Sequence, residues 1–143
     1  MAEAIIKGLL AGGVPAADLA VSEPSEQRRN LLSERYGIQV TGDNSALCKM
    51  SDTVILAVKP QIAAQALSGV GSSAAGKLFI SIMAGVKCAA IEGMLGSGAR
   101  VVRVMPNTPA LVLEAASAIS RGHNATDDDV SLSRRIFDLI GTT

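Results

Sequence analysis

VILAVKPQ (residues 54–61) and RVVRVMPNTPALV (residues 100–112) are the two stretches that decide the fold of this chain. Each is a short run rich in β-branched apolar residues, and each stops abruptly at polar residues and prolines. Apolar runs of this length are typical of strands that are buried on both faces of a parallel sheet. Ligands of open parallel sheets lie where such strands end. Both stretches therefore predict strands whose ends place backbone groups next to a ligand.

The remainder of the chain alternates strand-like and helix-like patterns with short turns, which predicts a doubly wound α/β domain. Strands are predicted at residues 18–22, 38–40, 53–58, 78–82, 100–104 and 117–120. Helices are predicted to begin near the N-terminus, at Ser25, at Asp43 or Asn44, at Pro60, at Lys87 and at Thr126. Glycines at residues 12, 13 and 37 are expected to end the first two helices.

Composition limits the classes of function. The 143 residues suffice for one domain with a core, and 48% hydrophobic but only 2% aromatic residues require a core of Ala, Val, Ile and Leu. Lys plus Arg and Asp plus Glu balance at 13 each, so charge gives no reason to expect nucleic acid or a membrane surface as partner. No apolar run approaches the roughly 18 residues of a membrane span.

Metal binding and disulfide formation are not predicted. Cys48 and Cys88 are isolated, without CxxC or Cys/His spacing, and they are expected to be small core residues in a reducing cytoplasm. His123 lies in the polar stretch RGHNATDDD without a second ligand nearby, so we expect a surface loop residue. Thr126 is expected to cap a helix whose first turn holds the acidic residues 127–129.

Two glycine patterns imitate phosphate-binding motifs. Gly69, Gly71 and Ala74 match the GxGxxA form of the dinucleotide fingerprint, and residues 71–77 match GxxxxGK. Both motifs require a preceding strand and a following helix, because the helix N-terminus receives the phosphate. Here a helix is expected before the glycines and a strand after them, so we predict a plain glycine-rich turn.

Together with SIMAG at residues 81–85, the two opening stretches resemble the pyrroline-5-carboxylate reductase family, which makes proline from its cyclic imine precursor. The resemblance covers nearly the whole chain and implies a Rossmann-like, mostly parallel α/β domain in the cytoplasm. It also implies hydride transfer from NAD(P)H to the C=N bond of 1-pyrroline-5-carboxylate. Two alternatives stay open. One is a silent truncated domain that binds nucleotide weakly or only packs against a partner, and the other is another imine or β-hydroxyacid reductase.

The resemblance also implies which elements flank these residues in the family. Family members begin with a strand and a glycine-rich turn before a helix like AEAIIKGLLAGG (residues 2–13). They continue past a segment like FDLIGTT (residues 137–143) into a helical domain that forms the dimer and carries the substrate loop. Residues 1–143 are therefore expected to form one cofactor domain without a catalytic residue of their own. Because the family's first strand lies in mid-sheet, we expect the isolated chain to be unstable or to close its sheet abnormally.

Cofactor contacts are implied by the resemblance at three strand ends. The AVKP turn (Ala57, Val58, Lys59, Pro60) would line the nucleotide between ribose and nicotinamide, and the SIMAG turn would offer Ile82, Met83 and Ala84 in the same role. Met83 is bulky where the family has a small residue, so its contact is expected through backbone. Asn107, held between two prolines in MPNTPA, would bond the carboxamide. The family commonly has a glycine shortly after this motif, where residues 113–116 read LEAA, which implies an altered loop.

The identity of the cofactor depends on the second strand and on the residues just after it. Asn44 in TGDN would contact the adenosine end of the cofactor near the 2′-phosphate, and it is also a candidate helix N-cap. The carboxylate of SEPS (residues 22–25) favours NAD, whereas Ser25, Arg28 and Arg29 could receive the extra phosphate of NADP. We favour NADP over NAD.

Overall fold

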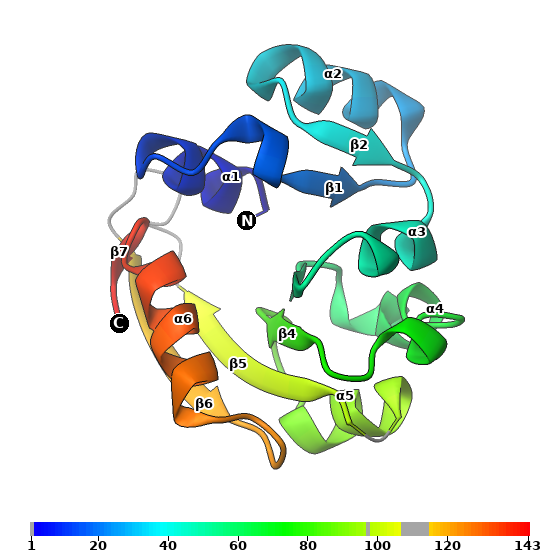
Figure 1. Ribbon diagram of the computed structural model, residues 1–143, viewed down its shortest axis with the longest axis vertical. Coiled ribbons are helices and arrows are strands. Elements are labelled where there is room, and N and C mark those ends of the chain that lie inside the picture. The colour runs from blue at the N-terminus through cyan, green and yellow to red at the C-terminus, as the bar shows by residue number, and fades with distance from the viewer. Residues whose placement is uncertain (1, 97, 107–114) are drawn as a thin grey trace.

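The strands form two separate sheets (Figure 1). A computed structural model describes residues 2–96, 98–106 and 115–143. In the smaller sheet, β1 (Ala20–Ser22) pairs in parallel with β2 (Gln39–Thr41). The larger sheet has the order β3-β4-β5-β6-β7. Its members are β3 (Thr53–Leu56), β4 (Leu78–Ser81), β5 (Arg100–Pro106), β6 (Ala115–Arg121) and β7 (Gly141–Thr142).

Most strand pairs are parallel, as the sequence predicts. The ladders β3-β4, β4-β5 and β6-β7 are parallel, and β5-β6 is antiparallel. The α-helices are α1 (Ala2–Ala11), α2 (Glu26–Tyr36), α3 (Asn44–Lys49), α4 (Ala63–Ala66), α5 (Cys88–Leu95) and α6 (Asp127–Phe137). Short 3₁₀ helices lie at Ala16–Asp18, Pro60–Ile62 and Gly71–Ser73. No helix in the described part of the chain is long and apolar enough to cross a membrane.

Both faces of the larger sheet are covered by helices. All four residues of β4 are buried, and alternate residues enter different clusters. Phe79 packs with α3, α4 and α5 on one face, while Leu78 and Ile80 pack with α1 and α6 on the other. This double burial explains why β4 reads as an uninterrupted apolar run.

Helix α1 connects the two sheets. Ala4 and Ile5 belong to the cluster on the larger sheet, whereas Ile6 packs with Leu32 and Ile38 beside the smaller sheet. The apolar residues of this helix therefore pack on two sides at once. Helix α1 holds together two units that share no strand pairing.

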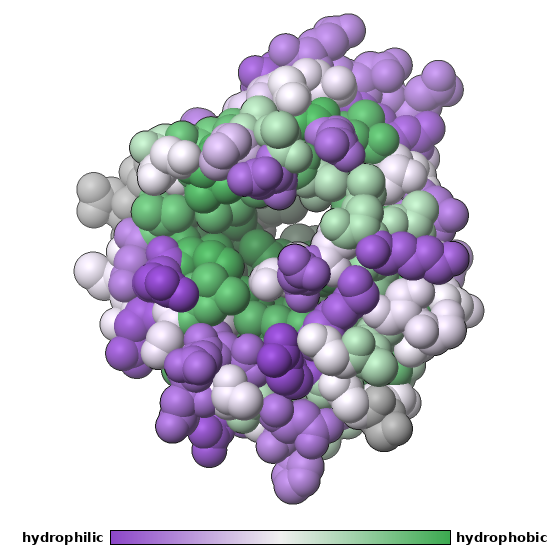
Figure 2. All heavy atoms as spheres, in the orientation of Figure 1, coloured by the Kyte–Doolittle hydropathy of each residue, from purple (hydrophilic) through white to green (hydrophobic). Residues whose placement is uncertain are grey.

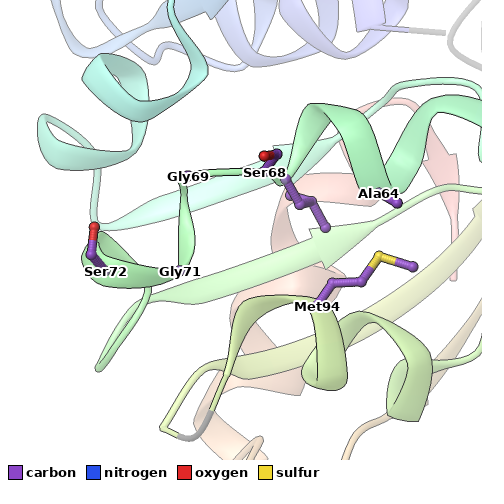
Figure 3. Close-up of a pocket in the computed structure, with 7 residues that line it drawn as sticks. Ala64, Ser68, Gly69, Gly71, Ser72 and Met94 are labelled. Atoms are coloured by element: carbon purple, nitrogen blue, oxygen red, sulfur yellow. The ribbon is translucent and has the colours of Figure 1, made fainter.

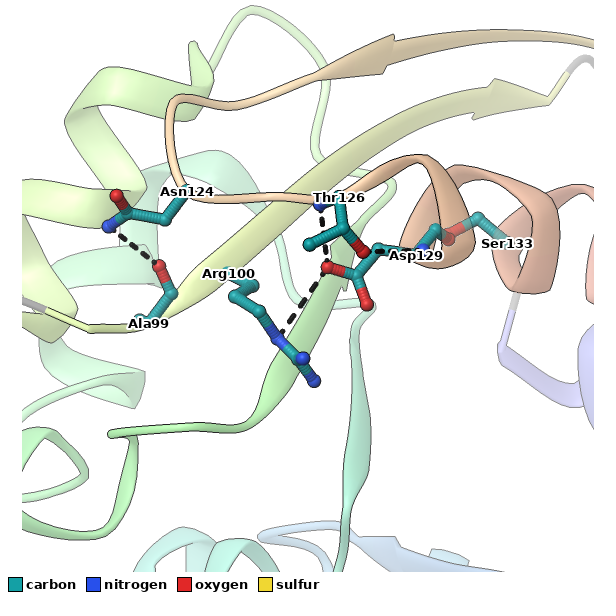
Figure 4. A network of polar contacts seen from close by, with 6 residues as sticks. All are labelled: Ala99, Arg100, Asn124, Thr126, Asp129 and Ser133. Atoms are coloured by element: carbon teal, nitrogen blue, oxygen red, sulfur yellow. Dashed lines mark hydrogen bonds and ion pairs between the residues drawn. The ribbon is translucent and has the colours of Figure 1, made fainter.

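Several helix ends follow the predicted caps. The Ser25 side chain accepts a hydrogen bond from the Arg28 amide, and Gly37 ends α2 with φ of 67°. Thr126 and Asp129 form a reciprocal capping box at α6, and Arg100 Nε lies 3.5 Å from the buried Asp129 carboxylate (Figure 4). This ion pair ties the start of α6 to Arg100 at the start of β5.

The structure corrects several predicted boundaries. The strand predicted at residues 18–22 begins at Ala20, because Ala16–Asp18 forms a 3₁₀ turn. The strands predicted at 100–104 and 117–120 extend to Arg100–Pro106 and Ala115–Arg121, because they pair with each other. Strand β7 was not predicted. Its two residues carry no strand pattern and are extended because they pair with Ala115 and Ala116.

Candidate functional site

A cleft lies between the two sheets. Its cavity volume is about 1190 Å³, and residues of β1 and β3 line it together with residues of α1 and α3. In the space-filling view, a hollow opens near the middle of one face and hydrophobic residues gather beside it (Figure 2). The carboxyl ends of β1 and β3 both border this cleft, as expected for a ligand site of an open parallel sheet.

The turns after β3 and β4 lie next to each other at this edge. The Ile82 amide donates to the Leu56 carbonyl at 3.1 Å, which places the SIMAG turn beside the AVKP turn. Of the predicted contact residues in these turns, Ala57, Val58, Lys59 and Met83 line the cleft. Pro60, Ile82 and Ala84 are not among its lining residues.

The AVKP turn presents a cation. Lys59 is exposed and precedes the 3₁₀ helix that Pro60 begins, so the predicted first-turn role of Pro60 is confirmed for a 3₁₀ helix. Across residues 2–96, 98–106 and 115–143, no carboxylate forms an ion pair with Lys59. Its ammonium group is therefore free to meet an anionic ligand that enters the cleft.

Met83 turns its side chain into the core. The residue is only 2% exposed and packs in the cluster that includes Phe79. The Met83 amide donates to the Oγ of buried Ser81 at 3.2 Å, which fixes the backbone of the turn. This exposed fraction covers backbone and side chain together, so the expected backbone contact of Met83 with a ligand stays a prediction.

Asn44 joins three elements and does not cap a helix. The N-cap of α3 is Asp43, whose carboxylate accepts from the Ser45 and Ala46 amides. Asn44 Oδ1 accepts from the Ser22 hydroxyl at 2.5 Å, and its Nδ2 donates to the Ala66 carbonyl at 2.9 Å. The candidate N-cap role is therefore wrong, because Asp43 occupies that position. Ser22 fixes Asn44 at the cleft, and the sequence analysis did not predict this role. The position of Ser22 at the end of a strand is the sequence feature that could have indicated it.

Of the two arginines that follow the SEPS segment, Arg28 has the weaker contacts. Ser25 is occupied as the cap of α2, and Arg29 donates to the carbonyls of Glu23 and Pro24 at 2.8 and 3.0 Å. Arg28 lines the cleft with its side chain 46% exposed, and it contacts Glu3 only at 3.8 Å. Of the three residues predicted to receive a 2′-phosphate, Arg28 is the one that remains available.

One predicted contact falls outside the described residues. Asn107 of MPNTPA lies in the segment 107–114, as do Leu113 and Glu114 of the expected loop change. Strand β5 leads up to this segment and ends at Pro106. The role of Asn107 therefore stays a prediction.

The glycines of the two patterns are not among the lining residues of the cleft, and two of them belong to a shallow pocket between α4 and α5. Gly69 and Gly71 line it together with Met94, and no charged side chain is among its lining residues (Figure 3). A helix precedes the glycines and β4 follows them, which confirms the predicted order of elements. A phosphate here would find neither a cation nor the strand-to-helix turn that such motifs require.

Neither cysteine is activated for chemistry. Burial raises the pKa of both the Cys48 and the Cys88 thiol, and nearby Glu92 adds to the rise at Cys88. Both cysteines are free. Among the residues that the structure places, no group of three or more His, Cys, Asp or Glu side chains could hold a metal ion.

Comparison with known proteins relates this cleft to nucleotide-dependent enzymes. Residues 1–85 match the family described as NADP oxidoreductase coenzyme F420-dependent. A pyrroline-5-carboxylate reductase of Methanosarcina acetivorans is 42% identical over 144 residues, which cover 99% of this chain and 53% of that protein. The solved structure of a pyrroline-5-carboxylate reductase from Coxiella burnetii has a TM-score of 0.94 at 30% identity, and the match covers 99% of this chain and 53% of that one.

A second solved structure shows a cofactor on the same fold. The pyrroline carboxylate reductase of Plasmodium falciparum with NADP bound has a TM-score of 0.85 at 28% identity, over 98% of this chain and 51% of that one. The chain spans about half the length of the curated relatives it matches. Because its residues 1–85 match that family, the chain belongs to the NADP oxidoreductase coenzyme F420-dependent family, and it is similar to pyrroline-5-carboxylate reductases.

Proposed function

We propose that residues 1–143 form the cofactor-binding domain of a pyrroline-5-carboxylate reductase that uses NADPH. The observation that carries this proposal is the convergence of Asn44, Ala57, Val58, Lys59 and Met83 on one cleft at the carboxyl ends of parallel strands. Four of these residues come from the turns after β3 and β4, and Asn44 from the start of α3. The relatives named pyrroline-5-carboxylate reductase support the assignment of substrate.

The residues present suit a dinucleotide. The cleft offers exposed turn backbone, a free ammonium group on Lys59 and an available guanidinium group on Arg28. Cations of this kind favour the phosphates of a nucleotide, and a planar guanidinium suits a 2′-phosphate. When bound, the cofactor would supply hydride to the C=N carbon of the protonated pyrroline carboxylate, which gives proline.

In this proposal, the residues of the chain bind the cofactor and hold it in position. Ala57, Val58 and the backbone of Met83 would lie along the nucleotide, with the Ser81 bond holding the Met83 backbone in place. Asn44, fixed by Ser22 and Ala66, would meet the adenosine end. Asn107 would orient the carboxamide. Substrate contacts and proton donation would come from outside residues 1–143, as would the surface that pairs two subunits.

The preference for NADPH has a matched test in two arginines that share one partner. Arg28 and Arg35 both pair with Glu3, but only Arg28 lines the cleft. By titration calorimetry, Arg28→Ala should weaken NADPH binding about five- to tenfold and leave NADH unchanged, the amount expected when one charged contact to phosphate is lost. Arg35→Ala should change neither. Equal losses for NADPH and NADH would contradict the assignment of Arg28 to the 2′-phosphate.

The site itself is tested at Lys59. Lys59→Ala should weaken both nucleotides about two- to fivefold, whereas Lys7→Ala, on an exposed part of α1 outside the cleft, should not. If wild-type protein with an intact fold binds neither nucleotide at millimolar concentration, the proposal fails. That result would favour the alternative of a silent domain that packs against a partner.

A further inference from the structure

A polar row crosses the larger sheet just before the turn that follows β4. Ser81, Arg103 and Ser120 are register partners on the neighbouring strands β4, β5 and β6. The residues on either side of Arg103 in β5, and the residue before Ser81 in β4, pack with α1 and α6. Because successive side chains of a strand point to opposite faces, Ser81 and Arg103 lie on the face that α5 covers.

Ser81 links this row to the turn after β4. Its buried Oγ accepts from the Met83 amide at 3.2 Å, so the row begins at the residue that holds the Met83 backbone. Adjacent strands of a sheet are about 5 Å apart. Arg103 therefore lies one strand away from a turn along which the proposed function places the cofactor.

The charge of Arg103 is not neutralised by an acid in the described ranges. None of the ion pairs found there includes Arg103, and its buried Nε has no hydrogen-bond partner. The other arginines of β5 and β6, Arg100 and Arg121, pair with Asp129 and Asp127. Arg103 is thus the arginine of these two strands that keeps an uncompensated positive charge.

The guanidinium group lies near the start of α5. Burial raises the pKa of the Cys88 thiol and nearby Glu92 adds to the rise, whereas the charge of Arg103 opposes it, which requires Arg103 to be close. Glu92 is engaged elsewhere, because its Oε1 accepts from the His123 amide at 2.7 Å. Cys88 begins α5 three residues after the SIMAG turn, so the charge of Arg103 lies near the carboxyl edge of the sheet.

The nicotinamide ring changes its charge with its oxidation state. The ring carries one positive charge in NADP⁺ and none in NADPH, whereas the rest of the cofactor is the same in both. A cation beside the ring therefore repels only the oxidised form. At about 10 Å, or two strand spacings, and an effective dielectric constant of about 20 to 40, this repulsion corresponds to roughly four- to fifteenfold in affinity before screening by salt.

We propose that Arg103 is a specificity-determining residue that makes this site prefer the reduced cofactor. Its charge acts through space on the nicotinamide ring, disfavours NADP⁺ and leaves NADPH unaffected. This inference rests on the proposed function, because it requires the nicotinamide half of the cofactor to lie at the turn after β4. The oxidised cofactor is then released more readily after hydride transfer than the reduced cofactor is before it.

The ratio of two dissociation constants tests this role. NADPH binding to chain 1–143 can be followed by the fluorescence of the cofactor, because the protein has no tryptophan, and NADP⁺ binding by displacement of NADPH. Arg103→Gln should lower the ratio of the NADP⁺ to the NADPH dissociation constant about three- to tenfold, by tightening NADP⁺. Arg103→Lys keeps the charge and should keep the ratio. Arg103→Met, a second uncharged variant, replaces Arg103→Gln if that protein does not fold.

Two controls separate charge from structure. Arg121→Gln removes an arginine that lies next to the row but is paired with Asp127, and it should leave the ratio unchanged. Adenosine 2′,5′-bisphosphate has no nicotinamide, so it should bind wild type and Arg103→Gln equally. An unchanged ratio in Arg103→Gln, or equal weakening of all three ligands, would overturn the inference and leave the proposed cofactor site standing. A wild-type protein that binds none of the three ligands would contradict the proposed function itself.

Discussion

At the scale of single residues, Glu3 has the densest set of polar contacts on α1. Its carboxylate accepts from the Tyr36 hydroxyl at 2.6 Å and from Arg35 at 2.7 Å, and Arg28 lies 3.8 Å away. These contacts join α1 to α2 across the cleft that both helices border. The hydrogen bond from Tyr36, followed by that from Arg35, lowers the pKa of Glu3 below its usual value.

The lowered pKa of Glu3 predicts a pH-dependent contribution to stability. A carboxylate whose folded-state pKa is depressed stabilises the fold above its unfolded pKa, and the contribution disappears as pH falls through the folded value. Glu3→Gln should therefore lower the free energy of unfolding by about 1 kcal/mol at pH 7 and by much less below pH ~4. Denaturant titrations at several pH values measure this difference.

The control for this prediction is Glu34→Gln, an exposed position on α2 for which the structure shows no ion pair among the residues it covers. Its effect should stay within a few tenths of a kcal/mol at every pH. A Glu3→Gln difference that persists unchanged at acid pH would show that the contacts of Glu3 do not depend on its charge.

At the scale of elements, the contact between α1 and the C-terminal segment depends on a glycine. A Cβ at Gly8 would collide with the Ile140 side chain and come within 3.1 Å of the Leu139 carbonyl. The helix therefore lies against residues 139–140 at a distance that only glycine permits. Gly93 in α5 is the opposite case, because a Cβ there would meet nothing within 4 Å.

These two glycines form a matched pair of predictions. Gly8→Ala should lower the free energy of unfolding by about 1–3 kcal/mol, because an overpacked contact must shift backbone or force a side chain off its rotamer. Gly93→Ala should raise it by about 0.5–1 kcal/mol, because alanine is the better helix former. Thermal or chemical unfolding measures both. A stabilising Gly8→Ala would mean that α1 can move away from residues 139–140 at little cost.

Sequence patterns predicted most elements, because most are decided by local signals. Buried runs such as LFIS and helix caps such as Ser25 and Thr126 act through neighbours in the chain, and they were placed within a few residues. Strand β7 was missed because its extended form depends on pairing with β6, about 25 residues earlier. The bridge from Asn44 to Ser22 and Ala66 was missed for the same reason: its partners are 22 residues away on either side.

At the scale of the whole molecule, the two sheets are two packing units, and both α1 and α3 contact each of them. The larger sheet has fully buried residues such as Phe79, Ile80 and Val101, whereas no residue of β1 or β2 is fully buried. The shape of the candidate site also depends on how the two sheets are placed. Strand ends could be predicted from the sequence, but the cleft itself arises from how two separately paired sheets are placed.

Unequal burial predicts unequal local stability. Amides of β1 and β2 should exchange through a partial opening that leaves β4 and β5 protected, because few buried apolar contacts hold the smaller sheet. We expect their opening free energy to be lower by at least about 1.4 kcal/mol, or about tenfold in rate. Native-state exchange in increasing denaturant measures this. A common opening free energy for both sheets would mean that they unfold as one cooperative unit.

The contact between Tyr36 and Glu3 also gives the protein an optical property. The chain has one tyrosine and no tryptophan, so its ultraviolet emission comes from a single ring. The hydroxyl of that ring is hydrogen-bonded to a carboxylate, an arrangement that quenches phenol emission. Separation of α1 from α2 should therefore brighten the protein. The natural sequence thus carries its own fluorescent reporter of the contact that holds its first two helices together.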